Sequence, residues 1–115
     1  MISKEKFAEY LRLVQTFEYE KAHEEFYHKK LIKHENEQAP TVGLLKHKEE
    51  MKAFLSSISE EKAALKQYLI GDGFSAVEWE YEFVHEDWGK RAFSQLSIQR
   101  WDKDKIVLER HHYQM

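Results

Sequence analysis

The sequence predicts a single α+β domain, residues 1–115, with about three N-terminal helices packed on a curved antiparallel β-sheet. In the first half, apolar residues recur at spacings of three and four, which is typical of helices with one buried face. After Glu61 the spacing changes to two, the period of strands. With 42% hydrophobic and 14% aromatic residues, 115 residues suffice for one core.

The first helix is expected to begin after Ser3, a residue favoured at helix N-caps. Residues 20–26 either continue this helix or form a second one, and we favour a break near residues 16–19. A third helix is expected over residues 42–57. The apolar positions that define the first and third helices are Phe7, Leu11, Val14, Phe17, Leu44, Leu45, Met51, Phe54, Leu55 and Ile58.

Between the second and third helices, a short strand is predicted from Leu31 to Glu35. Pro40 ends regular structure there, because it has no N–H donor and restricts Ala39 to an extended conformation. The second half predicts four antiparallel strands in meander order, separated by turns at "GDG", "EDWGK" and "DKDK".

The faces of this sheet follow from the pairing. If the last two hairpins have even-length loops, Phe83 pairs with Ala92 and Arg100 with Val107. The face toward the helices then has Val77, Trp79, Tyr81, Phe83, Ala92, Leu96, Ile98, Val107, Glu109, His111 and Tyr113. The outer face has Glu78, Glu80, Glu82, Phe93, Gln95, Gln99, Trp101, Leu108, Arg110 and His112, a mixture that suits a homodimer interface. A one-residue bulge at "EDWGK" would switch this pairing.

Glu109 and His111 are the titratable groups expected against an apolar wall that contains Trp79. Burial raises the pKa of a carboxyl group unless a cation or several donors meet it. The pair fits a general acid or base, a polar anchor for a ligand, or a Glu–His contact satisfied in solvent at the open end of the sheet.

Composition excludes several classes of function. A formal charge of -3 without a basic stripe argues against a nucleic-acid partner. No apolar run approaches the ~20 residues that span a bilayer, and "MISKEKFAEY" lacks a signal-peptide pattern, so we expect no membrane contact and a cytoplasmic location. Seven histidines without an H-E-x-x-H motif, and no glycine-rich phosphate loop, predict neither a bound metal nor another cofactor.

Three segments, "FYHKKLIKHENEQAPTVG", "GDGFSAVEWEYEF" and "SIQRWDKDKIVLERHHY", together resemble the SnoaL-like branch of the nuclear transport factor 2-like superfamily, which includes ketosteroid isomerase and limonene epoxide hydrolase. The similarity covers nearly the whole chain in its order of elements. It implies a cone-shaped fold, a pocket between the helices and the concave sheet, and a homodimer. In the isomerase branch a carboxylate base lies at the end of the first short strand, a location that falls at His34 or Glu35 here, without the usual aspartate.

Three hypotheses follow for the function. The first is a non-catalytic pocket that binds a small hydrophobic or aromatic ligand. The second is a proton-transfer enzyme of isomerase, cyclase or hydrolase type, with His34 or Glu35 as the base and Glu109, His111 or Tyr113 polarising the substrate. The third is a dimeric interaction module with a vestigial pocket. We favour the first, because no complete catalytic set is present; its expected lining is His34, Glu35, Trp79, Tyr81, Glu109, His111 and Tyr113.

Overall fold

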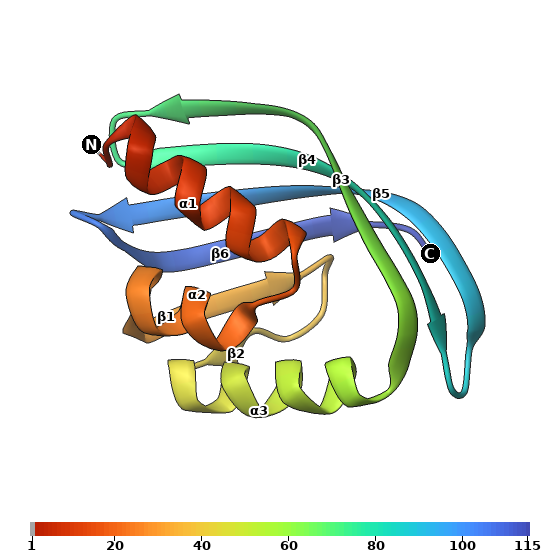
Figure 1. Cartoon of the computed structure of the whole chain (residues 1–115). Helices are drawn as coiled ribbons and strands as arrows, with labels where there is room; N and C mark the ends of the chain where they lie inside the picture. Colours follow the sequence, from red (N-terminus) through yellow and green to blue (C-terminus); the bar gives the residue numbers. More distant parts are fainter. Residues whose placement is uncertain (1) are drawn as a thin grey trace.

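In the computed structural model, which describes residues 2–115, six strands form one curved sheet and the helices lie on its concave side (Figure 1). This is the α+β arrangement that the sequence predicted. The elements follow one another as α1 (Lys4–Gln15), α2 (Tyr19–Phe26), β1 (Tyr27–Glu35), β2 (Thr41–Val42), α3 (Leu44–Ser56), β3 (Ile58–Gly71), β4 (Phe74–His85), β5 (Gly89–Asp102) and β6 (Lys105–Tyr113). In residues 2–115, no helix is both long and apolar enough to cross a membrane.

The helix boundaries agree with the sequence signals. The Ser3 hydroxyl accepts the Lys6 N–H at 3.1 Å and caps α1. After α1, Phe17 has a φ of 60°, which breaks the helix where a break was predicted. The third helix lies within the predicted range and follows Gly43, whose φ of 96° is readily adopted only by glycine.

The sheet has the strand order β2-β1-β6-β5-β4-β3. Its last four strands form the predicted antiparallel meander. The first strand is longer than predicted and pairs in parallel with β6, which places Lys33 beside Glu109 and Glu35 beside His111. This long-range pairing was not predicted from the sequence, and it brings the two candidate polar segments together.

The predicted register is wrong at two positions. His85 pairs with Gly89, so the β4–β5 loop has an odd length and Phe83 faces Arg91, not Ala92. A bulge after Arg100 then pairs that residue with Leu108, and Val107 falls in the bulge. The residues that change face are Ala92, Leu96 and Ile98, now on the outer face, and Phe93, Gln95, Gln99 and Trp101, now on the inner face. The two shifts cancel in β6, so Glu109, His111 and Tyr113 still face the helices.

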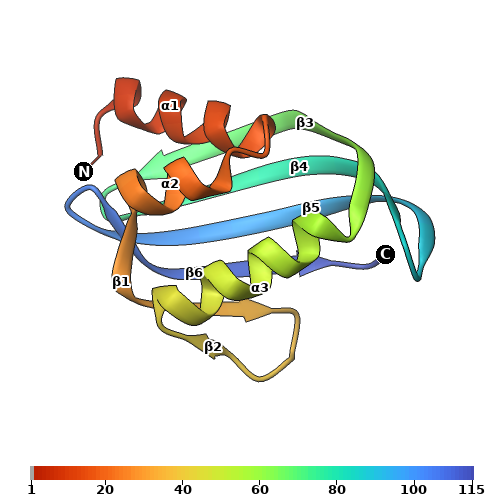
Figure 2. The same cartoon turned by 60° about the horizontal axis from the view of Figure 1, so that its bottom comes forward.

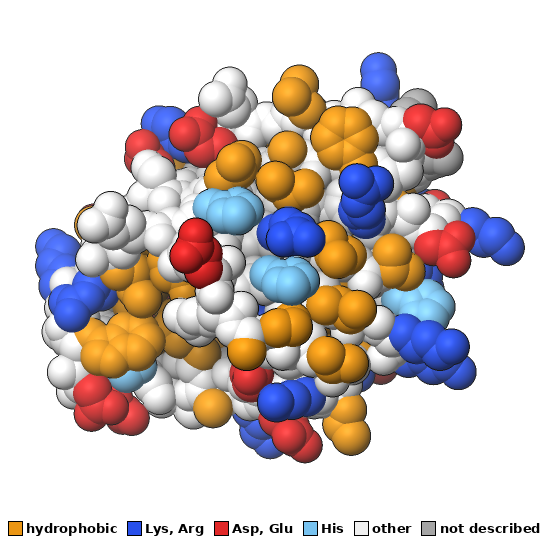
Figure 3. All heavy atoms as spheres, turned by 180° about the vertical axis from the view of Figure 1, so that it is seen from behind, with side chains coloured by type: hydrophobic (Ala, Val, Ile, Leu, Met, Phe, Trp, Pro, Cys, Tyr) orange, Lys and Arg blue, Asp and Glu red, His pale blue; other side chains and the backbone are white. Residues whose placement is uncertain are grey.

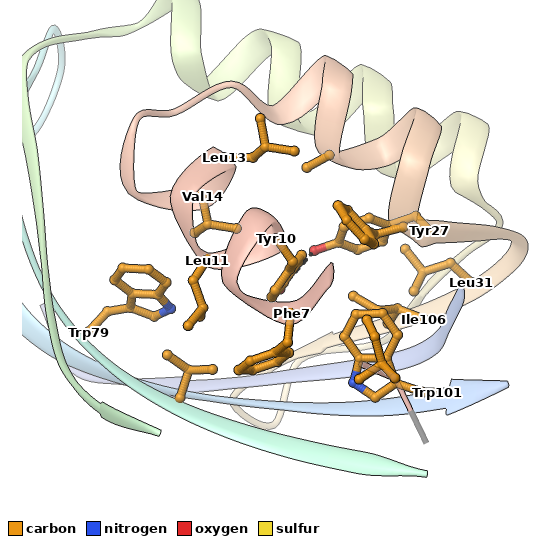
Figure 4. Packing of buried hydrophobic residues seen from close by; sticks show 14 of the residues in the cluster. Phe7, Tyr10, Leu11, Leu13, Val14, Tyr27, Leu31, Trp79, Trp101 and Ile106 are labelled. Atoms are coloured by element: carbon orange, nitrogen blue, oxygen red, sulfur yellow. Dashed lines mark hydrogen bonds between the residues drawn. The ribbon is translucent and has the colours of Figure 1, made fainter. Parts of the chain in front are cut away.

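The core lies where α1 and α2 pack on the concave face. Figure 4 shows Phe7, Tyr10, Leu11 and Val14 of α1 pointing toward the sheet. The rings of Phe7 and Tyr10 pack against the Trp101 indole, whose centroid lies 5.6 Å from that of the Tyr10 ring. The first helix contacts β3 whereas α3 contacts β1 and β2, so the two helices cover different edges of the sheet (Figure 2).

Candidate functional site

A cavity of about 410 Å³ lies between the helices and the concave face of the sheet. Its aromatic wall comes from every layer, with Tyr19 on α2, Phe54 on α3, Tyr81 and Phe83 on β4, and Phe93 on β5. Its ionised side chains come mainly from the neighbouring strands β1 and β6, with Lys33, Glu35 and Glu109, and Glu50 adds one from α3. The cavity therefore has an aromatic side and a polar side.

The structure places most of the predicted site residues around this cavity. Those that line it are Glu35, Trp79, Tyr81, Glu109, His111 and Tyr113. His34 is not among them, because it pairs with Arg110 on the outer face of the sheet. Of the two residues proposed as a base at the end of the first strand, only Glu35 borders the cavity.

Glu109 is the centre of the polar side, although only 2% of its surface is exposed. Its Oε1 accepts the Tyr27 hydroxyl at 2.7 Å, and its Oε2 accepts the Tyr10 hydroxyl and the Gln99 amide, each at 2.9 Å. His111 Nε2 lies 3.4 Å from Oε1. Burial raises the pKa of Glu109, but His111 and the donated hydrogen bonds outweigh it, so the pKa lies well below the usual range.

The two tyrosines remain donors because their own pKa values move in the opposite direction. Burial first, and then the charge on Glu109, raise the pKa of Tyr10 and of Tyr27 well above the usual value. Figure 4 shows these two side chains turned toward each other, and their hydroxyl oxygens are 3.4 Å apart. The carboxylate thus stays ionised in the interior because neutral donors surround it.

A chain of buried hydrogen bonds supports Glu109 from behind. Trp101 Nε1 donates to Ser75 Oγ at 2.9 Å, and Ser75 Oγ donates to Gln99 Oε1 at 2.6 Å. Because an ionised carboxylate can only accept, Glu109 fixes the Gln99 amide with its nitrogen toward the carboxylate, and Gln99 Oε1 is then left to accept from Ser75. The corrected register is what places Gln99 and Trp101 on this inner face.

His111 joins Glu109 to a second pair of side chains. Its Nδ1 lies 2.7 Å from Ser97 Oγ and 3.1 Å from Gln95 Nε2. The Gln95 nitrogen can only donate, so Nδ1 accepts and the ring proton lies on Nε2, facing Glu109. Ser97, His111 and Glu109 are therefore linked in a line along the cavity wall.

The rim of the polar side centres on Lys33, whose side chain is only 5% exposed. Its ammonium group lies 3.2 Å from Glu35 Oε2 and 3.6 Å from Glu50 Oε1. The Tyr113 hydroxyl donates to Glu35 Oε1 at 3.0 Å. Burial raises the pKa of Glu35, but Lys33, His111 and the Tyr113 hydroxyl together lower it below the usual value.

Two buried histidines lie on the helical side. The His23 and His47 rings are 4.7 Å apart, and His47 also stacks on Tyr27. Among residues 2–115, no group forms a hydrogen bond with His23 Nε2 or His47 Nδ1. Burial lowers the pKa of His23 to about 4 and that of His47 to about 3, so both rings are neutral at pH 7.

Sequence reasoning missed several of these residues. Tyr10, Tyr27 and His47 are on the buried faces of helices or at a strand start, where a polar tip is indistinguishable from core packing. Lys33 could have been found, because it lies between Leu31 and Glu35 in the alternation of β1. In residues 2–115, no cluster of three or more His, Asp or Glu side chains has the arrangement of a metal site.

No protein-family model and no curated protein matches this sequence. Solved structures do match. A Mesorhizobium loti protein named as a SnoaL-like polyketide cyclase is 12% identical, with a TM-score of 0.87 over 98% of this chain and 100% of its own. An LEH-like epoxide hydrolase of M. tuberculosis is 9% identical, with a TM-score of 0.76 over 96% of this chain and 80% of its own.

A third match is a Catenulispora acidiphila protein with a ketosteroid isomerase-like fold, solved in complex with trimethylamine. It is 10% identical, with a TM-score of 0.69 over 78% of this chain and 71% of its own. At these identities the likeness concerns the fold alone. The chain has the fold of the SnoaL-like and nuclear transport factor 2-like proteins, which confirms the fold implied by the sequence resemblance.

Proposed function

We propose that this protein binds a small, largely apolar or aromatic molecule in the cavity. The observation that supports this most directly is the separation of an aromatic side from a polar side around about 410 Å³. Binding sites for small molecules have this character, because apolar walls provide affinity and a few polar groups fix orientation. The structural neighbour solved in complex with trimethylamine supports the proposal, since it is a protein of this fold that holds a small organic molecule.

The state of Glu109 favours binding over catalysis by that residue. Its Oε2 accepts two hydrogen bonds, and its Oε1 accepts one and lies beside the His111 imidazole. Its lowered pKa keeps the carboxylate ionised. An acid must give up a proton near the working pH and a base must have a free lone pair. Glu109 accordingly serves to hold Tyr10, Tyr27 and His111 in place.

The test uses a neutral fluorescent probe, N-phenyl-1-naphthylamine, titrated into the protein. We expect saturable binding of one probe per chain in the wild type. Met51→Trp, which fills the cavity from α3, should abolish it, whereas Lys52→Trp on the exposed side of the same helix should not. Absence of saturable binding to the wild type, or equal binding by both variants, would overturn the proposal.

A second candidate, a proton-transfer enzyme, is favoured by the line of Ser97, His111 and Glu109. A carboxylate that fixes the tautomer and orientation of a histidine is a common arrangement for general acid–base chemistry. Here His111 Nδ1 would accept or return the proton through the Ser97 hydroxyl, which lies 2.7 Å from it, and Glu35 is the second candidate base. The M. tuberculosis neighbour is a hydrolase by name, which agrees with the hydrolase type among the candidate reactions.

This candidate is tested with a panel of enolisable ketones and epoxides. His111→Asn and Glu35→Gln should each lower turnover at least about ten-fold. His112→Asn is the matched control, because its side chain projects from the outer face of the same strand. If no compound is turned over, or if His111→Asn and His112→Asn behave alike, the protein is not an enzyme of this kind.

We also propose that a second copy of the chain covers the outer face of the sheet. Apolar side chains gather across this face, and Leu69, Phe74 and Leu96 are among the exposed ones (Figure 3). Glu78, Glu80 and Glu82 form an acidic row on β4, with Arg110 and His112 on β6, and β5 lies between these strands. A two-fold axis along β5 would place the acidic row of one copy opposite the basic groups of the other.

Light scattering coupled to size exclusion tests the homodimer. We expect twice the chain mass for the wild type and the chain mass for Leu96→Lys, which places a cation at the centre of this face. The Lys90→Leu variant, near the hairpin tip, should remain dimeric. A wild type that elutes at the chain mass would contradict the dimer. Ligand binding retained by Leu96→Lys would show that the pocket does not depend on the interface, against the interaction-module hypothesis.

A further inference from the structure

We infer that the ligand of this cavity is an organic cation, a small amine or quaternary ammonium compound with an apolar or aromatic body. This inference rests on the proposed binding function and specifies the chemical class of its ligand. The observation behind it is the balance of charge around the cavity. The carboxylates of Glu35, Glu50 and Glu109 border it, against the single ammonium group of Lys33.

The charge stays negative whichever form His111 adopts, since one further positive charge does not balance three carboxylates. His47, the other histidine on the wall, is neutral at pH 7 because burial lowers its pKa to about 3. The hydroxyl groups that meet Glu109 stabilise its charge without cancelling it. A low-dielectric wall with one sign of charge concentrates ligands of the opposite sign.

Lys33 does not offer a site for an anion. Its ammonium group is buried and already lies within 3.2 Å of Glu35 and 3.6 Å of Glu50. An anionic ligand would have to replace one of these partners and would then lie beside the displaced carboxylate. The Glu35 and Glu50 side chains remain 38% and 42% exposed, so both can still meet a cation.

Aromatic rings lie directly beside this acidic rim. Tyr113 donates its hydroxyl to Glu35, and its ring centroid is 5.5 Å from that of Phe93. Phe93 in turn lies 5.9 Å from Tyr81 and 5.8 Å from Phe83. A weakly hydrated ammonium group gains from ring faces as well as from carboxylates, whereas an anion is repelled by both. An apolar body attached to the cation would occupy the aromatic side.

The experiment compares three probes of nearly the same shape: phenyltrimethylammonium, neutral tert-butylbenzene and anionic benzenesulfonate. Each competes with N-phenyl-1-naphthylamine at low ionic strength. We expect phenyltrimethylammonium to compete at a concentration at least about ten-fold below that of tert-butylbenzene, and benzenesulfonate to compete weakest. The advantage of the cation should shrink at 0.5 M salt, since exposed carboxylates at the rim are screened.

Variants that replace carboxylates by neutral amides show which residues cause the preference for the cation. Glu35→Gln/Glu50→Gln should reduce the ratio of cation affinity to tert-butylbenzene affinity several-fold, and any general change in the pocket cancels in this ratio. Glu37→Gln, an exposed carboxylate outside the cavity lining, is the matched control and should change nothing. If tert-butylbenzene binds as well as the cation, or if benzenesulfonate binds best, the cation inference fails and the proposed binding function stands. If neither the neutral fluorescent probe nor any of the three compounds binds, the proposed function itself fails.

Discussion

The hydroxyl of Tyr27 donates a hydrogen bond of 2.7 Å to Glu109. Both residues are buried, with Tyr27 5% exposed and Glu109 2% exposed. Tyr27 begins β1 and Glu109 lies in β6, while Tyr10 reaches the same carboxylate from α1. One buried anion thus joins a helix to two strands. Loss of any one donor therefore leaves the buried Glu109 carboxylate with an unsatisfied hydrogen-bond acceptor, which costs stability.

Tyr27→Phe should lower the free energy of unfolding by about 1–3 kcal/mol, because it removes a donor and leaves its buried partner unsatisfied. The pKa of Glu109 should rise, since the Tyr27 hydrogen bond is one of the groups that lower it. Urea unfolding at pH 7 measures the first effect. Tyr68→Phe is the control, because that side chain is 50% exposed, and its effect should stay within about 0.5 kcal/mol. Equal effects of the two variants would show that the Tyr27 hydroxyl contributes no more to the free energy of unfolding than an exposed tyrosine hydroxyl does.

Gln99→Glu should destabilise the protein more strongly, because it places a second carboxyl group where an amide donates to Glu109 at 2.9 Å. Two carboxylates at this distance cannot both ionise, so the pKa of one rises and folding takes up a proton. We expect a loss of about 3–5 kcal/mol at pH 7 that is partly recovered as the pH falls toward 5.

Gln99→Met separates loss of the donor from gain of the charge. It removes the amide at similar volume, so its cost should not be recovered at lower pH. Thermal melts of both variants and the wild type between pH 5 and pH 8 provide the comparison. A Gln99→Glu protein whose stability falls with decreasing pH in parallel with the wild type would contradict the shared-proton account.

The buried pair His23 and His47 should make the wild type less stable in mild acid. Their pKa values in the folded protein are about 4 and about 3, whereas an unfolded histidine titrates near 6.5. Between these values the unfolded chain binds more protons, so stability is fully present above pH 6.5 and is lost as the pH falls. Each histidine should cost about 2 kcal/mol at pH 5 relative to pH 7.

His47→Phe should remove about half of this pH dependence, and His112→Phe, at an exposed position, serves as the comparison. Urea titrations at pH 7 and pH 5 give the two free energies for each protein. The carboxylates with lowered pKa values, Glu35 and Glu109, add their losses only at still lower pH, which keeps the two contributions apart. An unchanged slope in His47→Phe would mean that the ring is already protonated in the folded state.

The fold was largely predictable from the sequence because its elements are defined by local patterns. Ser3 marks the start of α1, and the period of two after Glu61 marks the meander. The parallel pairing of β1 with β6 was not predictable, since no local spacing specifies which strands meet across seventy residues or more. That pairing is also what unites Lys33 and Glu35 with Glu109 and His111.

The site was predictable only in part for the same reason. The face that a strand residue occupies depends on the register of the pairing. The β4–β5 loop at Trp88 has an odd length instead of the predicted even one, which moves Gln95, Gln99 and Trp101 from the outer face to the cavity side. Glu109 and His111 were placed on the correct face because the bulge after Arg100 offsets that error. Burial of Glu109 was expected to raise its pKa unless several donors met it, and the donors that do so, Tyr10, Tyr27 and Gln99, come from three different elements.

Gly43 is the position where backbone conformation alone should control both stability and the cavity. It precedes α3 with φ 96° and ψ 142°, and a Cβ atom there would meet nothing within 4 Å. Gly43→Ala should therefore destabilise the protein by about 1–3 kcal/mol through backbone strain without any steric clash. Because α3 supplies His47, Glu50 and Phe54 to the cavity wall, the variant should also weaken binding of N-phenyl-1-naphthylamine.

Gly71→Ala provides the opposite case, because Gly71 has no positive φ and its added Cβ would collide with the ring of Phe74. That ring is 44% exposed and can rotate away, so the cost should be smaller than for Gly43→Ala, and probe binding should be unchanged. Melting temperatures and probe titrations of the two variants measure both effects. If Gly71→Ala proves the more damaging, steric contact rather than backbone conformation limits what the fold tolerates at these two positions. Unchanged probe binding by Gly43→Ala would show that the start of α3 does not control the cavity.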